Sequence, residues 1–138
     1  MREILFKAKR IDNGEWVEGY YIRDQYHIGG KDIIFYRKDS DRFTVYTDII
    51  DLETLCQFTG LYDKNGKKIW ENDILMAHLD EFYPEDATYE TVEWGIAGWV
   101  TREASSTDRQ YLDKFDLEHY EVVGNTFDNP ELPQEEHK

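Results

Sequence analysis

The Asn65-Gly66 dipeptide and the residues around it constrain the fold most strongly. A two-residue type I′ turn needs positive φ at both central positions, which Asn tolerates and Gly adopts freely. Apolar segments flank the dipeptide within residues 57–76, so the sequence predicts a β-hairpin with a type I′ turn. A further turn at 71–73 leads into the apolar segment 74–77, for which a short strand is expected.

Similar patterns recur along the chain. Ile4, Phe6 and Ala8 alternate with other side chains, which indicates a strand with one buried face, and Asn13-Gly14 marks a hairpin. Further strands are expected at 16–22, 32–36, 43–50, 55–60, 89–94, 99–102 and 120–123. Between them we expect a charged loop at 37–42, an acidic loop at 78–88 and a mobile-looking loop at 104–108. We also expect a turn or helical turn at 51–54 capped by Asp51, a short helix over 108–116 and a break or bulge at 124–125.

Many short strands separated by Gly and Asn turns favour a mainly β fold, a short-stranded barrel or sandwich with little helix. The order of strands and turns after residue 72 suits an SH3-like barrel portion in the C-terminal half. The expected organisation is a single domain over 1–132, with a possible subdivision into 1–54 and 55–132, followed by a flexible tail at 133–138. Eight residues are expected to determine turns or the fold: Gly60, Asn65, Gly66, Asn72, Asp73, Gly124, Asn125 and Pro130.

Composition narrows the range of functions. The 138 residues include 40 % hydrophobic and 15 % aromatic side chains, which is enough for a core. The formal charge of -14, from 16 basic and 30 acidic residues, argues against direct binding to nucleic acid or to an anionic membrane. The acidity favours solubility, or alternatively attracts a basic partner or mimics a nucleic acid. Cys56 is the only cysteine, and no signal-peptide or membrane-spanning pattern occurs, so a reducing cytoplasm is expected.

Candidate reactive residues have simpler structural interpretations. Asp63, Glu71 and Asp73 could hold a divalent cation, but their spacing fits no EF-hand and favours turn residues that bond their own backbone. The group His78, Asp80 and Glu81 lacks a second His, and Ser105-Ser106 lacks a GxSxG setting. Cys56 lies in an alternating apolar pattern typical of a packed residue. The sequence therefore assigns no catalytic residue, no cofactor and no metal.

Four aromatic residues allow two interpretations. Tyr62, Trp70, Trp94 and Trp99 either fill the core or form a candidate interaction surface. Open sheets expose strand edges, and the three prolines, at 84, 130 and 133, lie outside the expected strands and cannot blunt them. We therefore expect a homo-oligomer, most simply a symmetric dimer.

Three segments together resemble a known family. Residues 58–74, FTGLYDKNGKKIWENDI, are similar to the signature YTGLKDKNGKEIYEGDIV of the YopX protein family. Residues 120–132, YEVVGNTFDNPEL, resemble the family's closing motif, and residues 2–8, REILFKA, resemble its opening. Asn72 stands where the family usually has Gly, which Asn can replace at positive φ, and Trp70 stands for a Tyr.

The resemblance implies a phage or prophage gene in a bacterial host, a largely β fold and no established activity. The leading hypothesis is accordingly a non-enzymatic module that binds an unidentified protein or associates with itself. An acidic decoy that mimics nucleic acid is the alternative, and a carboxylate- or metal-dependent enzyme is a third. Segments 24–42 and 78–88 match no motif of the family, and their roles stay open.

Overall fold

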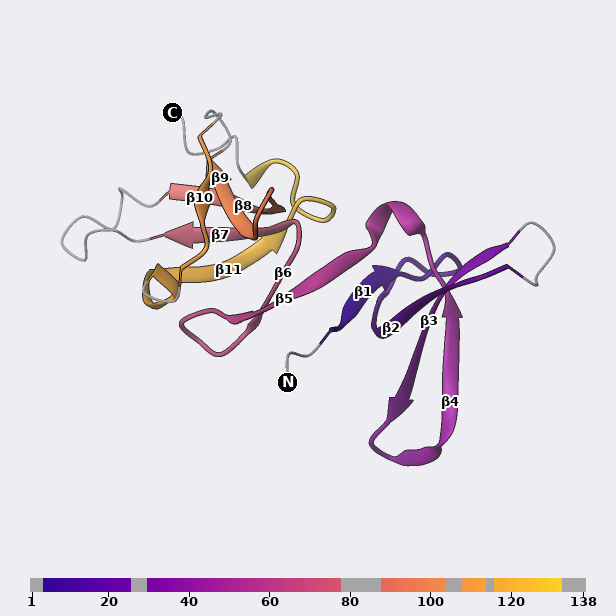
Figure 1. Ribbon diagram of the computed structural model, residues 1–138. Coiled ribbons are helices and arrows are strands. Elements are labelled where there is room, and N and C mark those ends of the chain that lie inside the picture. The colour runs from indigo at the N-terminus through magenta and orange to yellow at the C-terminus, as the bar shows by residue number, and fades with distance from the viewer. Residues whose placement is uncertain (1–3, 26–29, 78–87, 104–107, 114–115, 133–138) are drawn as a thin grey trace. The chain divides into compact units, whose positions relative to one another are not determined.

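The computed structural model describes residues 4–25, 30–77, 88–103, 108–113 and 116–132. Strands dominate these residues, and the helices among them are short 3-10 turns (Figure 1). The described strands form two antiparallel sheets, neither of which closes into a barrel. The prediction of a mainly β fold with little helix is confirmed, whereas the barrel is not observed. By internal contacts the chain divides into two compact units, residues 1–58 and 59–138.

The first unit is a run of antiparallel hairpins. Its strands are β1 (Phe6–Lys9), β2 (Trp16–Asp24), β3 (Lys31–Lys38) and β4 (Asp41–Ile49). The hydrogen-bonded order is β4-β3-β2-β1-β5, where β5 (Cys56–Tyr62) begins in this unit and continues into the second. A small core lies on one side of the sheet and consists of Ala8, Val17, Ile34 and Ile50.

Turns in the first unit follow the sequence with one exception. Gly14 has φ 73° at the β1–β2 turn, and Asp51 accepts the Glu53 N–H at 3.1 Å to cap the 3-10 helix η1 (Leu52–Thr54), as expected. The loop predicted at 37–42 is shorter than expected, because β3 runs to Lys38 and β4 starts at Asp41, which leaves residues 39–40 as the turn. A register shift between Tyr36 and Lys38 lets the strands stay paired to the turn.

The second unit is built on a five-stranded antiparallel sheet. Its strands are β7 (Asp73–Ala77), β8 (Thr88–Trp94), β9 (Trp99–Glu103), β10 (Gln110–Tyr111) and β11 (Tyr120–Asn125), in the order β10-β9-β8-β7-β11. Strand β6 (Lys68–Trp70) neighbours β5 in the other sheet, and η3 (Asp116–His119) precedes β11. The core cluster comprises Ile69, Leu75, Ala77, Val92, Trp99 and Tyr120.

The helix expected over 108–116 is wrong. Gln110 and Tyr111 instead form β10 and pair with Thr101 and Val100 of β9. The Leu112 N–H also donates to the Trp99 carbonyl at 2.9 Å. The edge of β9 thus offers this segment backbone partners, and that tertiary pairing outweighs a helical spacing of apolar residues.

The central hairpin has a different turn from the one predicted. Gly66 has φ 79°, but Asn72 is the only non-glycine residue described with positive φ, so a type I′ turn at Asn65-Gly66 is wrong. The Gly66 N–H donates to the Asp63 carbonyl at 3.0 Å, and the Asp63 N–H donates to the Lys67 carbonyl at 2.8 Å. These bonds define a three-residue loop with a left-handed third residue.

Several expectations lie outside the described residues. They include nearly all of the acidic loop with His78, Asp80, Glu81 and Pro84, the segment 104–107 with Ser105 and Ser106, and the tail 133–138. Among the residues that are described, no helix has the length and apolarity required to cross a membrane.

Candidate functional site

The structure separates the four predicted aromatic residues into two pairs. Trp70 and Trp99 are only 5 % and 8 % exposed, so of the two interpretations the core holds for them and the interaction surface is wrong. Tyr62 and Trp94 are 46 % and 57 % exposed. The exposed Trp94 remains a candidate for recognition, and its surroundings decide what it can recognise.

Trp94 lies at the tip of the β8–β9 hairpin. It pairs in register with Trp99, and their rings meet edge to face with centroids 4.7 Å apart. The Gly95 N–H donates to the Gly98 carbonyl at 2.7 Å, which closes the turn and leaves Ile96 fully exposed. The buried ring of Trp99 therefore packs against the exposed ring of Trp94 and supports it.

A groove of about 430 Å³ adjoins this hairpin tip. We call its exposed members, Trp94, Ile96, Arg109 and Tyr111, the Trp94 surface. Gly95 and Val100 complete the lining. Tyr111 reaches the groove because β10 pairs with β9, the pairing that the sequence did not predict.

An ion-pair network fixes the Arg side of this surface. Arg102 donates from Nε and Nη2 to Glu93 Oε1 at 3.0 and 2.8 Å, and Arg109 Nε donates to Oε2 at 3.2 Å. The hydrogen bonds from Arg102, with a further contribution from Arg109, hold the pKa of Glu93 below its ordinary range. Glu93 is therefore ionised at neutral pH and positions Arg109 beside the groove.

The first unit carries a second exposed apolar surface. Tyr20 and Ile22 of β2 pair with Phe35 and Ile33 of β3, and the rings of Tyr20 and Phe35 are 5.5 Å apart. Register partners in adjacent strands point to the same side of a sheet. With their neighbours on β4 they form what we call the β2–β4 face: Tyr20, Ile22, Ile33, Phe35, Val45, Thr47 and Ile49.

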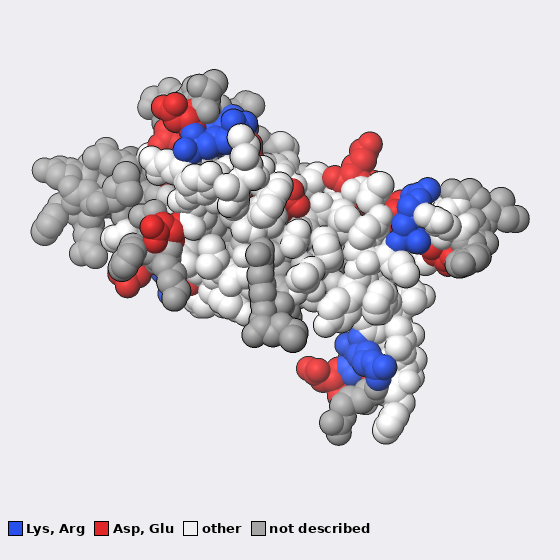
Figure 2. Space-filling model, in the orientation of Figure 1, with Lys and Arg blue, Asp and Glu red and all other residues white. Residues whose placement is uncertain are grey.

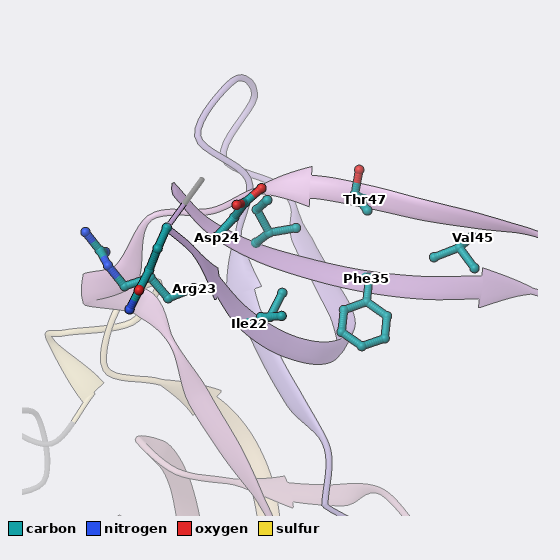
Figure 3. Close-up of a pocket in the computed structure, with 8 residues that line it drawn as sticks. Ile22, Arg23, Asp24, Phe35, Val45 and Thr47 are labelled. Carbon is teal, nitrogen blue, oxygen red and sulfur yellow. The ribbon is translucent and has the colours of Figure 1, made fainter. Parts of the chain in front are cut away.

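The β2–β4 face contains a groove of about 380 Å³. Figure 3 shows Ile22, Phe35, Val45 and Thr47 on three adjacent strands around it, with Arg23 and Asp24 at one end. Its other lining residues are Gln25 and Ile33. The floor and walls are thus mainly aliphatic and aromatic.

The opposite side of the same strands combines apolar and charged side chains, since the register places Arg23, Asp32 and Asp48 there beside Ile34. It holds Ile34, fully buried in the core, and two tyrosines whose hydroxyls donate to carboxylates, Tyr21 to Asp32 at 2.6 Å and Tyr36 to Asp48 at 2.9 Å. The hydrogen bond to Asp32 raises the pKa of Tyr21 above its ordinary value. This sheet therefore presents apolar side chains on both sides.

The suggested metal ligands serve the backbone instead. Asp63 Oδ1 accepts the N–H groups of Asn65 and Lys67 at 2.8 and 2.9 Å, and its Oδ2 accepts the Val122 N–H at 3.0 Å. Asp73 Oδ2 accepts the Trp70 N–H at 2.8 Å. Within the described part of the chain, no three His, Cys, Asp or Glu side chains gather as a metal site would require.

Cys56 is 1 % exposed, and its Sγ donates to the Thr54 carbonyl at 3.3 Å. The bond lies in the interior of the first unit, where a thiol behaves as a small packed group. This is the packed environment that its alternating sequence context favours.

The predicted turn residues either adopt positive φ, lie where a side chain would not fit, or accept hydrogen bonds from nearby backbone N–H groups. Gly60 has φ 85° and Asn72 has φ 69°, the latter as expected for an Asn in place of Gly. Gly124 lies at a register shift in β11, where a Cβ would collide with the Asn129 side chain. Asn125 Oδ1 accepts the N–H groups of residues 127 and 128, and Pro130 follows in the next turn.

Sequence reasoning missed the β2–β4 face as well as Ile96 and Arg109 as parts of a surface. One available signal was the run Ile33-Ile34-Phe35-Tyr36. An antiparallel strand with one wet face alternates apolar and polar residues, so four apolar residues in succession indicate a strand covered on both sides. No comparable signal marks Arg109, because its partner Glu93, which accepts its hydrogen bond, lies 16 residues earlier in the sequence.

Comparison with protein families identifies the chain. The model of the YopX protein family matches residues 5–134, nearly the full length. The chain belongs to the YopX protein family. A search of curated proteins gives no significant match.

The fold of this YopX protein is shared with a solved structure. The crystal structure of protein EF1440 from Enterococcus faecalis is similar with a TM-score of 0.57 and 20 % sequence identity. The similarity covers 96 % of this chain and 99 % of that protein. At this level of identity the likeness concerns the fold alone.

Proposed function

We propose that this YopX protein is a non-enzymatic module of a phage or prophage that acts in the cytoplasm of the bacterial host by binding another protein. The observation that carries the proposal is the Trp94 surface, where exposed Trp94, Ile96, Tyr111 and Arg109 border one groove. Trp, Tyr and Arg are the residues most enriched in the energetic centres of protein interfaces. The β8–β9 hairpin holds Trp94 in place, and the ion pair with Glu93 holds Arg109. A surface that is already ordered loses less entropy when a partner binds.

The SH3-like interpretation of residues 55–132 is part of this proposal. Domains of that class bind extended segments in grooves lined by aromatic side chains. The groove beside Trp94 and Tyr111 offers this chemistry, with Arg109 able to contact carbonyl or carboxylate oxygens of a bound segment. A protein segment with apolar side chains is therefore the expected ligand.

Site-specific crosslinking tests the proposal. A photoreactive amino acid placed at Ile96 should crosslink a defined protein in host cells that carry the phage or prophage. The same group at Tyr62, which is 46 % exposed and lines neither groove, is the matched control. For the protein so identified, Trp94→Ala should weaken binding by about 30-fold, the effect of losing an interface centre worth roughly 2 kcal/mol. Identical crosslinks from both positions, or none from Ile96, would contradict the proposal.

A second candidate is an acidic decoy for a nucleic-acid-binding protein. The observation in its favour is that residues 59–138 hold 19 acidic and 7 basic residues, a net charge of -12. Against it, the face in Figure 2 shows acidic and basic side chains in small mixed groups separated by uncharged surface. Competition with DNA for a host nuclease at low salt, where charge effects are strongest, is the test, and absence of competition there would eliminate it.

A further inference from the structure

We propose that the β2–β4 face binds the same face of a second copy of this chain, forming a weak two-fold symmetric dimer. This surface shares no residue with the Trp94 surface, so the two proposals can succeed or fail separately.

The first argument is the composition of the sheet. An antiparallel sheet whose second face stays in water usually places polar side chains there. Here Tyr20, Ile22, Val45 and Ile49 are 42–52 % exposed on one side, while Ile34 packs in the core on the other. A sheet with a core on one side and a largely apolar, exposed face on the other is the pattern of a sheet covered on both sides.

The second argument is electrostatic and decides which partner fits. Residues 1–58 hold 9 basic and 11 acidic residues, a net charge of only -2, although the whole chain carries -14. The seven residues of the β2–β4 face are uncharged, and the charges at its end are of both signs: Arg23 and Asp24 line that end of the groove, and Lys31 is the register partner of Asp24. A basic ligand would find little charge to bind here, whereas a second copy brings an equally uncharged apolar face.

Shape supports the same partner. Tyr20, 52 % exposed, stands on the face beside the groove that Ile22, Phe35 and Val45 line. In a two-fold contact each patch meets the same patch on the other copy. The Tyr20 side chain of each copy can then enter the groove of the other. Two sheets packed face to face lie about 10 Å apart with their side chains interleaved.

The area available sets the strength of the contact. Four large side chains, each about half exposed, offer on the order of 400 Å² of apolar surface per copy, at the level of the largest patch on a typical monomer. Two copies then bury less than the roughly 1,200 Å² at which stable interfaces begin. The dimer should accordingly be reversible, with a dissociation constant in the micromolar range or weaker.

Sedimentation equilibrium of the full chain tests this inference between micromolar and millimolar concentration. The mean mass should rise from 16.5 kDa toward twice that value. The variants Ile22→Lys and Val45→Lys, which place a charge in the face, should stay monomeric, whereas Leu52→Lys, at a position 47 % exposed outside the face, should associate like the wild type. High salt should preserve the dimer, because it screens repulsion between the acidic units and weakens no ion pair in the contact.

A cysteine introduced as Ile22→Cys should in addition crosslink two copies more readily under mild oxidation than Leu52→Cys does, because only the first lies in the contact. The native Cys56 is buried and adds no background. Monomeric wild type throughout the range, or dimerisation unchanged in both lysine variants, would overturn the inference. Loss of the dimer in Trp94→Ala would overturn it as well, because the second copy would then occupy the Trp94 surface.

Discussion

The two units of this YopX protein differ in the way they use polar groups. In residues 59–138 the carboxylate of Asp63, 6 % exposed, accepts three backbone N–H groups, and Glu90, 8 % exposed, accepts the Thr101 hydroxyl at 2.8 Å. In residues 1–58 the tyrosine–carboxylate pairs of Tyr21 and Tyr36 are only part-buried. The second unit thus holds hydrogen-bonded carboxylates in its buried interior, whereas those of the first unit lie nearer to solvent.

The distribution of apolar surface differs in parallel. The larger core cluster lies in the acidic second unit, and the open sheet face lies in the nearly neutral first unit. A charged exterior keeps a unit dispersed in water, whereas a neutral unit can bring an apolar face against another chain without strong repulsion. Together with the proposed dimer, this contrast assigns internal stability mainly to the second unit and self-association to the first. Three comparisons of matched variants can break it.

The largest difference is expected between two carboxylates. Asp63→Ala removes the acceptor of three backbone N–H groups in a buried setting and should lower the free energy of unfolding by about 3 kcal/mol. Asp32→Ala in the first unit removes the partner of the Tyr21 hydroxyl and of Arg23 at a more accessible site and should cost about 1 kcal/mol. Urea unfolding measures both. Equal costs would show that the units do not differ in their use of buried carboxylates.

A smaller and equal effect is expected at two matched glycines, one in each unit. Gly14 has φ 73° and Gly66 has φ 79°, and an added Cβ would meet no atom within 4 Å at either position. Gly14→Val and Gly66→Val should therefore each cost about 2 kcal/mol from backbone strain alone. Thermal unfolding of the two variants sharpens the comparison, since any excess at Gly66 measures how strongly the Asp63 loop depends on that turn.

The smallest effects concern pH, and they have opposite signs in the two units. The pKa of Glu93 in the second unit is lowered from 4.5 by Arg102 and Arg109, so its stabilisation is present above the unfolded pKa and is lost as pH falls through the folded one. The pKa of Tyr21 in the first unit is raised from 10.0 by Asp32, so its stabilisation is present below pH 10 and is lost as pH rises through the folded value.

Variants isolate these contributions. The stability difference between wild type and Glu93→Gln should shrink below pH 4.5, and that between wild type and Tyr21→Phe should shrink above pH 10. Each should amount to less than about 1 kcal/mol, because both pairs are partly open to solvent. Chemical denaturation over a pH series checks the sign, and a Tyr21→Phe difference that grows with alkali would contradict it.

Local chemistry in the sequence was sufficient where a residue acts on its immediate neighbours. Asp51 caps its own helical turn, Gly14 closes its own hairpin and Asn72 takes positive φ beside Asp73. The turn at Asn65-Gly66 was placed correctly but given the wrong geometry, because the type of turn depends on the Asp63 side chain two residues earlier. The positions of most strands and the β class follow from many such local signals together.

Prediction failed where a partner distant in sequence decides the outcome. Trp94 and Trp99 are equivalent as sequence features, and only the packing of the second unit buries one and exposes the other. Residues 110–111 become a strand because β9 has an edge to pair with, and Arg109 gains its place from Glu93. Surfaces are assembled from such distant residues, so the candidate sites were harder to predict than the fold.

The bond between Asp63 and Val122 also determines an order of events during synthesis. Its partners are 59 residues apart, and β11 must be made before β7 gains its second neighbour. The strands of the first unit need nothing beyond residue 58, except the continuation of β5. At about 5–20 residues per second, the ribosome needs several more seconds to reach Asn125. During that interval the strands β1 to β4 of the first unit have all their sheet partners within the emerged chain, so this unit can pair before the second unit is complete.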